Sequence, residues 1–449
     1  MSVKERFEHH FSESNLKSLH QTHIVLSAAT GIDNLSQKTF WPTLDAQIKI
    51  ISKKVLAGTY KFTKYKLKLI SKGRGKVPRE ISIPTIRDRV ALRALCDFLT
   101  ERYKDSVKTD LPQYKVRKVK KEIESGRYGR FIKLDVSNFY PTIRHRDLSS
   151  RLRRKIRNPV IINFIEGAIK TPTVSKSLPT DKCPTRGIPQ GLSVSNVLAE
   201  IFLINLDKKL LGNLKIAYFR YVDDILILCD DQSVQQISND VIKMFRRIGL
   251  EVHDTNMGPP GKSLTGAIGD SFDYLGYQFK GKEINPRPTS VERLKESLVS
   301  IFAAYKHSKN KSEKFLLWRL NLRITGCVFQ NKSKGWLFFF SEINNETLLH
   351  NLDRHVLSLV DRFKVSILPK RFVRTHYEIK HAKYQTKYIP NYDRFTLDQI
   401  KDFLITYFNT YFNSKNISSL TDEEIKYEFR KRIDRQVRDL LTDVQDFWS

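Results

Sequence analysis

The pattern of apolar and polar positions predicts helices first and strands later. The first 60 residues are predicted to be mainly helical, because apolar residues recur at helical spacing at Leu44, Ile48, Ile51 and Leu56. A Lys-rich, strand-like stretch follows at 60–70, and a further helix is predicted over 88–99. Phe131–Val136 then forms a short apolar run typical of a strand, with Asp135 near its end.

Two apolar runs at 217–228, A-Y-F-R-Y-V-D-D-I-L-I-L, flank the adjacent carboxylates Asp223 and Asp224. The aromatic and branched residues on each side predict a β-hairpin with both charges at its tip. Asp-Asp is a poor turn sequence, and two like charges at one tip cost stability unless a cation lies between them. A hard divalent metal is the natural candidate. A second pair, Asp230 and Asp231, is interpreted as the exposed end of the same strand.

A third carboxylate and a loop complete this pattern. If Asp135 meets Asp223 and Asp224, three carboxylates can hold two Mg²⁺ ions roughly 3.5–4 Å apart, as in phosphoryl transfer. Between them lies G-I-P-Q-G-L-S at 187–193, which leads into a helix predicted from about Ser193. Backbone groups and the Gln190 amide at this helix entry can meet a nucleotide.

Composition narrows the class of partner. The 449 residues include 79 Lys and Arg against 48 Asp and Glu, a net charge of +31. This excess favours a polyanionic partner, nucleic acid first and an anionic membrane surface second. We expect a cytoplasmic protein without a membrane partner, because no apolar stretch reaches the length of a membrane span and the polar start lacks a secretion signal. The spacing of Cys96, Cys183, Cys229 and Cys327 fits neither a zinc site nor a disulfide framework.

Several basic stretches accompany the carboxylates, and each has two interpretations. The turn at 71–79 carries Lys72, Arg74, Lys76 and Arg79, which either grip phosphates or form a solvated hairpin tip. A basic helical stretch is predicted over 114–130. Bases and aromatic rings alternate over 362–388, which suits phosphate contact and base stacking or a solvated surface above core aromatics. A helix is predicted over 291–305, a buried element over 336–340, and a capping box at Thr421 and Glu424.

Six segments resemble sequence blocks of reverse transcriptases of the group II intron type and their bacterial relatives. The segments occur along this chain in the same order as in that family. Two of them resemble the family's fingers blocks, A-T-G-I-D-N-L-S at 29–36 and K-V-P-R-E-I-S-I-P-T-I-R-D-R-V at 76–90. F-I-K-L-D-V-S-N-F-Y and F-R-Y-V-D-D resemble its two catalytic blocks, and G-I-P-Q-G-L-S its template and nucleotide loop. S-F-D-Y-L-G-Y-Q-F at 271–279 resembles the block that holds the primer end.

The resemblance implies an α+β fold, a right-hand polymerase. Fingers and a palm of antiparallel strands backed by helices would precede a mainly helical thumb and C-terminal region. The expected boundaries are an N-terminal extension with fingers at 1–130, a palm at 131–285 with fingers–palm helices around 144–180, a thumb at 286–345 and a basic helical region at 346–449.

The resemblance also implies roles for individual residues. Asp135, Asp223 and Asp224 would be catalytic and hold two Mg²⁺ ions, or Mn²⁺ in their place, with the Val136 carbonyl as a further ligand. Nucleotide contacts would come from Lys72, Lys76, Arg79, Gln190 and Tyr140. Tyr140 stands at the family's steric gate, which would exclude a 2′-hydroxyl, although a core aromatic beneath the turn fits the same pattern. Tyr274, Leu275 and Gly276 would hold the primer.

Departures from the intron pattern refine the implied function. Ser195-Asn196 stands where intron enzymes usually have Ser-Pro, which is more similar to the abortive-infection and defence-associated reverse transcriptases. The expected Lys after G-L-E-V-H-D is not clearly placed, with Lys262 a candidate, and neither an endonuclease module nor an RNase H pattern is evident. The implied protein is an RNA-directed DNA polymerase in phage defence, using dNTPs and an RNA template, with a dedicated noncoding RNA as candidate, to make DNA.

Two alternatives remain open from the sequence, and a third is disfavoured. Template-independent or protein-primed DNA synthesis is one, and a nucleic-acid-binding defence scaffold with an idle site is another. An RNA-dependent RNA polymerase is disfavoured by the aromatic Tyr140. A homo-oligomer or a second protein partner also stays open.

Overall fold

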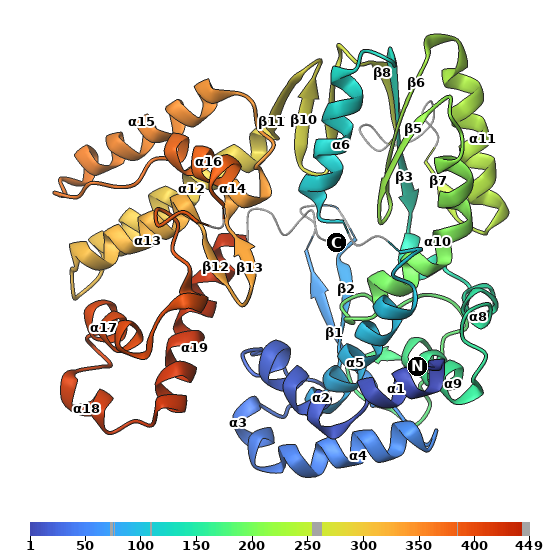
Figure 1. Cartoon of the computed structure of the whole chain (residues 1–449), viewed down its shortest axis with the longest axis horizontal. Helices are drawn as coiled ribbons and strands as arrows, with labels where there is room; N and C mark the ends of the chain where they lie inside the picture. The colour runs from blue at the N-terminus through green and yellow to red at the C-terminus, as the bar shows by residue number, and fades with distance from the viewer. Residues whose placement is uncertain (72–74, 76, 108–109, 254–262, 384, 442–449) are drawn as a thin grey trace. The chain divides into compact units, whose positions relative to one another are not determined.

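A computed structural model describes the chain except for residues 72–74, 76, 108–109, 254–262, 384 and 442–449 (Figure 1). The chain forms two compact units. The first comprises residues 1–109 and 129–266, and the second residues 110–128 and 267–449. The four-part division expected from the sequence stays a prediction, and each unit is described by itself below.

The first unit begins with helices and continues as a mixture of helices and strands. Ser2 caps the first helix with a capping box, and Thr85 caps α5 by accepting from the Asp88 N–H. Its helices are α1 (Val3–His10), α2 (Glu13–Leu19), η1 (His20–Ile24), α3 (Gln37–Phe40), η2 (Trp41–Thr43), α4 (Leu44–Leu56), α5 (Ile86–Arg102), α7 (Phe139–Thr142), α8 (His145–Arg153), α9 (Pro159–Lys170), α10 (Ser195–Leu211), η3 (Asp231–Ser233) and α11 (Val234–Arg247).

An antiparallel sheet forms the part of this unit that carries the acidic residues. Its strands lie in the order β5-β6-β3-β7, and β8 also pairs with β3. Helix α11 packs against β3 and β7 (Figure 1). A separate small sheet has the order β2-β1-β4. The strands are β1 (Tyr65–Ile70), β2 (Arg79–Ile83), β3 (Arg130–Ser137), β4 (Thr173–Val174), β5 (Ala217–Tyr221), β6 (Asp224–Cys229), β7 (Glu251–Val252) and β8 (Leu264–Ala267).

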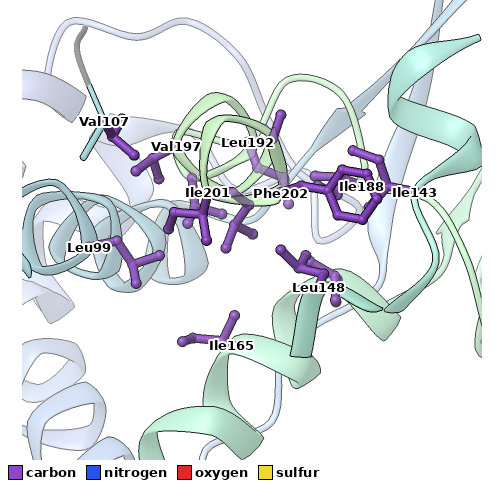
Figure 2. Packing of buried hydrophobic residues seen from close by; sticks show 14 of the residues in the cluster. Leu99, Val107, Ile143, Leu148, Ile165, Ile188, Leu192, Val197, Ile201 and Phe202 are labelled. Carbon is purple, nitrogen blue, oxygen red and sulfur yellow. The ribbon is translucent and has the colours of Figure 1, made fainter. Parts of the chain in front are cut away.

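The core of the first unit surrounds α10, which is apolar on several faces. Figure 2 shows Val197, Ile201 and Phe202 of this helix among side chains from other elements of the unit. Ile188 and Leu192, from the loop that precedes α10, point into the same cluster (Figure 2). Because burying a large apolar side chain contributes about 1.5–3 kcal/mol, this packing fixes both the helix and the loop at its entry.

The second unit joins a three-stranded antiparallel sheet, in the order β11-β10-β9, to a mainly helical region. Trp336 and the four residues after it are buried, as predicted for 336–340. Its elements are α6 (Pro112–Glu124), β9 (Ser271–Tyr274), β10 (Tyr277–Lys280), β11 (Glu283–Pro286), α12 (Pro288–Lys306), α13 (Glu313–Thr325), β12 (Cys327–Phe329), β13 (Lys332–Lys334), α14 (Trp336–Phe339), α15 (Glu346–Phe363), α16 (Phe372–His381), η4 (Tyr392–Arg394), α17 (Leu397–Tyr407), α18 (Ser414–Ser418) and α19 (Asp422–Leu441).

Helix α6 belongs to the second unit although it lies between two parts of the first unit in the sequence. The Arg117 guanidinium donates to the buried Glu342 carboxylate at 2.7 Å, and the Gln113 amide donates to the Phe338 carbonyl at 2.9 Å. The sequence predicted a basic helix here but gave no sign of these contacts. Hydrophobic periodicity reports which face of a helix is apolar, and it does not report which distant segment covers that face.

The predicted α+β fold class is confirmed. One detail of the first long helix was predicted wrongly. Leu56 was placed on the apolar face of the first long helix, but it is 39% exposed, and Val55 is buried instead. The buried face therefore runs through positions 44, 48, 51 and 55, which keeps the 3–4 residue spacing that position 56 breaks. The capping box at Thr421 and Glu424 is present. Among the described residues, no helix is long and apolar enough to cross a bilayer.

Candidate active site

A tight hairpin places two carboxylates at the end of β5 and β6. Tyr221 pairs with Asp224, so Val222 and Asp223 alone form the connecting turn. Val222 adopts a left-handed φ of 55°. A β-branched residue in this region is a genuine outlier, of order 1–3 kcal/mol above its relaxed conformation. The hairpin predicted from the sequence is confirmed, but only Asp223 lies in its strained turn, because Asp224 is the first residue of β6 rather than a turn residue.

Asp135 lies directly opposite Asp224 in the antiparallel pairing of β3 with β6. The backbone groups of Asp135 are used on the other side of β3, because its N–H donates to the Ser263 hydroxyl at 3.2 Å and its carbonyl accepts from the His253 N–H at 3.1 Å. Asp135 and Asp224 therefore form a non-hydrogen-bonded pair, the type in which Cα atoms approach to about 4.5 Å and side chains lie closest. Like charges directly opposite each other destabilise a sheet, so this arrangement favours a bound cation.

The next residue of β3 faces the hairpin turn with its backbone. The Val136 N–H donates to the Asp223 carbonyl at 3.2 Å. The N–H and C=O of one residue in an antiparallel strand point to the same side. The Val136 carbonyl therefore points toward the hairpin, as its expected role as a ligand requires.

The donor set suits a hard cation. Three half-buried carboxylates, Asp135, Asp223 and Asp224, and one backbone carbonyl supply only oxygen, which Mg²⁺ and Mn²⁺ prefer. Across the described part of the chain, no group of three His, Cys, Asp or Glu side chains is already gathered as a metal site. The backbone thus brings the three Asp residues together, while their side chains are not drawn around a common point.

The buried Arg220 holds the strained Val222-Asp223 turn through a hydrogen bond to its backbone. Arg220, on β5, donates to the Val222 carbonyl at 2.9 Å. Its guanidinium also binds the carboxylates of Glu200, at 2.7 Å, and Asp207, at 2.5 Å, both on α10. These carboxylates raise the pKa of Arg220 well above its usual value, although burial alone would lower that pKa. Arg220 stands within F-R-Y-V-D-D, and nothing in the surrounding sequence indicates this supporting role.

The loop that carries Gln190 is attached to a neighbouring strand and to α10. The Gln190 carbonyl accepts from the Ser82 N–H of β2 at 2.7 Å. Gly191 has a φ of 99°, and a Cβ there would lie 2.7 Å from Ile81, so only glycine fits this close approach. Ser195 donates to the Pro189 carbonyl at 2.6 Å and closes the loop onto α10, which begins two residues later than predicted.

Tyr140 is attached to this loop through its backbone, and its phenol is affected by the charge of Asp223. Its carbonyl accepts from the Ile188 N–H at 2.9 Å, and its side chain is buried. Burial raises the pKa of Tyr140, and the negative charge of Asp223 raises that pKa further. The structure therefore places the phenol near one carboxylate of the candidate site, where both the gate and the core interpretation of Tyr140 remain compatible with its burial.

The remaining predicted site residues lie on other elements or outside the described residues. Arg79 is the first residue of β2, three positions before Ser82. Lys72, Arg74, Lys76 and Lys262 lie outside the described residues. Tyr274 ends β9, and Leu275 and Gly276 form the two-residue turn between β9 and β10, which belongs to the second unit. Asp230 and Asp231 are exposed at the end of β6, as expected.

Comparison with known proteins identifies the matching family. Residues 70–279 match the model of the family described as reverse transcriptase (RNA-dependent DNA polymerase). Protein YkfC of Escherichia coli (strain K12) is 26% identical over 194 residues, which cover 40% of this chain and 49% of YkfC. The chain thus spans about half the length of this curated relative.

Two of the solved structures to which the chain is similar are telomerases. The apo telomerase of Candida tropicalis has a TM-score of 0.43 and 14% identity, over 86% of this chain and 65% of that one. The telomerase of Candida albicans, in complex with a TWJ fragment of telomeric RNA, has the same TM-score and identity, over 87% of this chain and 69% of that one.

The family match covers every described residue of the candidate site. Asp135, Tyr140, Gln190, the acidic hairpin and the 274–276 turn all lie within residues 70–279. Residues 70–279 are therefore similar to reverse transcriptases, and the predicted enzyme class, RNA-directed DNA polymerase, agrees with the description of that family.

Proposed function

We propose that this protein is an RNA-directed DNA polymerase that adds dNTPs to a primer at Asp135, Asp223 and Asp224. The observation that carries the proposal is the direct pairing of Asp135 with Asp224 beside the Asp223 turn, within the span that matches reverse transcriptases. Carboxylates facing each other in this way are unfavourable by themselves and favourable around cations.

Two divalent ions complete the proposed chemistry. Mg²⁺, or Mn²⁺ in its place, would make the primer 3′-hydroxyl a better nucleophile and stabilise the departing pyrophosphate. The three carboxylates and the Val136 carbonyl would hold these ions. The Arg220 network keeps the carboxylate-bearing turn in place, so that the site is organised before the substrate arrives.

The surrounding residues would position the nucleotide. Gln190 lies at the entry of α10, in a loop whose backbone is fixed by Ser82, and would contact the sugar. The Tyr140 ring would occupy the space that a ribose 2′-hydroxyl needs. Arg79, with Lys72 and Lys76 shortly before it in the sequence, would contact the triphosphate. Tyr274, Leu275 and Gly276 would hold the primer end.

The biological role extends the proposal further. The net charge of +31 supports a nucleic-acid partner, and we propose an RNA template, with a dedicated noncoding RNA as the candidate. A role in phage defence rests on the resemblance of the Ser195-Asn196 variant to defence-associated reverse transcriptases of the abortive-infection type.

The enzymatic proposal is tested by purifying the protein with its co-purifying nucleic acid, supplying a primed RNA template, Mg²⁺ and dNTPs, and sequencing the products. Templated DNA made by wild type and by Asp231→Ala, and absent with Asp223→Ala, supports it. The control removes an exposed Asp of the second pair. Products that ignore the template sequence would favour template-independent synthesis, and products covalently attached to the protein would favour protein priming.

The defence proposal needs a separate test in cells. A phage challenge should show protection by wild type and by Asp231→Ala, and loss of protection with Asp223→Ala. Equal protection by all three would favour the nucleic-acid-binding scaffold over the enzyme.

A further inference from the structure

Asn196, in the first turn of α10, is hydrogen-bonded directly to Tyr140, the residue at the gate position. The Tyr140 hydroxyl donates to the Asn196 side-chain carbonyl oxygen at 2.5 Å. Tyr140 is 7% exposed, whereas Asn196 is exposed. Asn196 thus connects a buried phenol to the surface at the nucleotide loop. A proline, which the intron pattern has at this position, offers no side-chain acceptor.

This hydrogen bond fixes the direction of the Tyr140 side chain, which the backbone contacts leave free. The Ile188 N–H already holds the Tyr140 carbonyl, and Phe139 packs beside the ring at 5.4 Å between centroids. The direction of the phenol is the remaining freedom. Burial raises the Tyr140 pKa, with Asp223 and Glu200 acting in the same sense, so the hydroxyl stays protonated and stays a donor.

The acceptor is itself held in place. Ser195, the residue before it, donates to the Pro189 carbonyl, which ties the start of α10 to the Gln190 loop. Asn196, Glu200 and Asp207 lie four and seven residues apart, on one face of α10. Glu200 and Asp207 bind Arg220, which supports the acidic turn. One helix face therefore positions both the phenol and the carboxylates.

We propose that Asn196 is a specificity-determining positioning residue, which holds the Tyr140 ring where it excludes ribonucleotides. This inference rests on the proposed polymerase function and adds a residue to its selection of sugars. Without the Asn196 acceptor, the ring can shift or rotate, and the space for a 2′-hydroxyl opens. A misplacement of about 1 Å in a catalytic site can change rates by 10²-fold, so a moderate loss of selectivity is expected.

The test compares dNTP and rNTP incorporation by the full-length protein on one primed RNA template. The readout is the ratio of kcat/KM for dGTP to kcat/KM for GTP. We expect Asn196→Ala to lower this ratio about 10-fold, which corresponds to about 1.4 kcal/mol. Tyr140→Phe keeps the ring and removes the donor, so it should lower the ratio by a similar factor. Asn205→Ala, an exposed asparagine of the same helix, should leave the ratio at the wild-type value.

The double variant separates positioning from general damage. If both side chains act through one hydrogen bond, Asn196→Ala with Tyr140→Phe lowers the ratio no further than either single change. A purely structural role would instead reduce incorporation of both nucleotides equally and leave the ratio unchanged. Should the ratio hold in Asn196→Ala and Tyr140→Phe while wild type polymerises, the inference fails and the function stands. A wild type that incorporates neither nucleotide overturns the function and the inference with it.

Discussion

The β9–β10 and β5–β6 hairpins both have two-residue turns, and they are stabilised differently. The β9–β10 turn, Leu275-Gly276, has positive φ at both positions, 48° and 82°, as type I′ turns require. It is anchored by apolar packing, because the flanking Tyr274 and Tyr277 are fully buried and Phe272 stacks on Phe279. The β5–β6 turn, Val222-Asp223, instead has a valine at a φ of 55° and rests on the ion-paired Arg220.

The difference follows from what each hairpin carries. A turn surrounded by apolar residues can rely on burial. A turn that must keep two carboxylates accessible to a ligand cannot bury those side chains, so part of its support comes from the hydrogen bond of Arg220 to its backbone. Strain is tolerated at such a site when the surrounding structure holds it in place. The following predictions test this contrast.

The largest effect is expected from the acidic residues themselves. Asp135→Asn preserves size and pairing but removes one charge from the pair with Asp224. We expect nucleotide incorporation to fall on the order of 10³-fold, since losing a metal ligand removes several kcal/mol of transition-state stabilisation. Steady-state incorporation assays should show it, with Asp230→Asn as the matched control. Activity within a few-fold of wild type would contradict the assignment.

Removing Arg220 should destabilise the first unit. Arg220→Ala leaves Glu200 and Asp207 partly buried without their cation, and breaking a buried pair costs about 3–5 kcal/mol. Denaturant unfolding of the first unit should report this loss. Arg130→Ala removes an arginine from the surface ion pair with Asp231 and should cost at most about 1 kcal/mol. Equal costs for the two variants would contradict the view that the polar network supports the acidic hairpin.

The second unit should lose stability in acid through His376. Burial lowers the pKa of His376 to about 4, with the charge of Lys380 as a further cause. The folded state therefore keeps the ring neutral, while the unfolded chain protonates it below its ordinary pKa of 6.5. Stability from this group is complete above pH 6.5 and falls as the pH drops toward 4. Thermal unfolding between pH 7 and 4 should show this decline, and His376→Gln should make it shallower. An unchanged pH profile in that variant would contradict the assignment.

The β9–β10 turn should depend on its glycine. Gly276→Ala places a Cβ at a φ of 82°, which costs about 1–2 kcal/mol. Chemical denaturation of the second unit measures this cost. Gly281→Ala, at a φ of 55° after β10, introduces the same kind of strain outside the 275–276 turn and calibrates it. A neutral Gly276→Ala would contradict the view that this turn depends on a residue that tolerates a positive φ.

The smallest effect concerns the coupling of Val222 to Arg220. Val222→Gly relieves the strained φ but loses the buried side chain. In an Arg220→Ala background, where the carbonyl of residue 222 is no longer held, we expect Val222→Gly to be less damaging by about 1 kcal/mol. A double-mutant cycle by denaturant unfolding gives this coupling. Strict additivity would show that Arg220 does not hold the turn.

The sequence predicted the local parts of the site well. Alternating and branched residues around Asp223 and Asp224 predicted the hairpin, and the apolar run ending at Asp135 predicted β3. Their meeting was expected because three carboxylates in this order resemble one family's site. These features depend on short segments, and short segments carry their own pattern of hydrophobicity.

The supporting contacts could not be predicted in the same way. Arg220 was visible beside the acidic pair, but its partners Glu200 and Asp207 lie on a helix earlier in the chain. The Tyr140–Asn196 hydrogen bond joins residues 56 positions apart. Helix α6 contacts the second unit through the Arg117–Glu342 pair, which joins residues 225 positions apart. Such contacts are set by tertiary packing, which leaves no local period in the sequence.

The central claim is that Asp135, Asp223 and Asp224 bind cations together. Mn²⁺ binding, followed by electron paramagnetic resonance with a non-hydrolysable dNTP analogue, tests it most directly. We predict two bound Mn²⁺ ions per wild-type chain and per Asp230→Asn chain, and at least one fewer in Asp135→Asn. Full Mn²⁺ binding by Asp135→Asn would contradict a shared site at these strands.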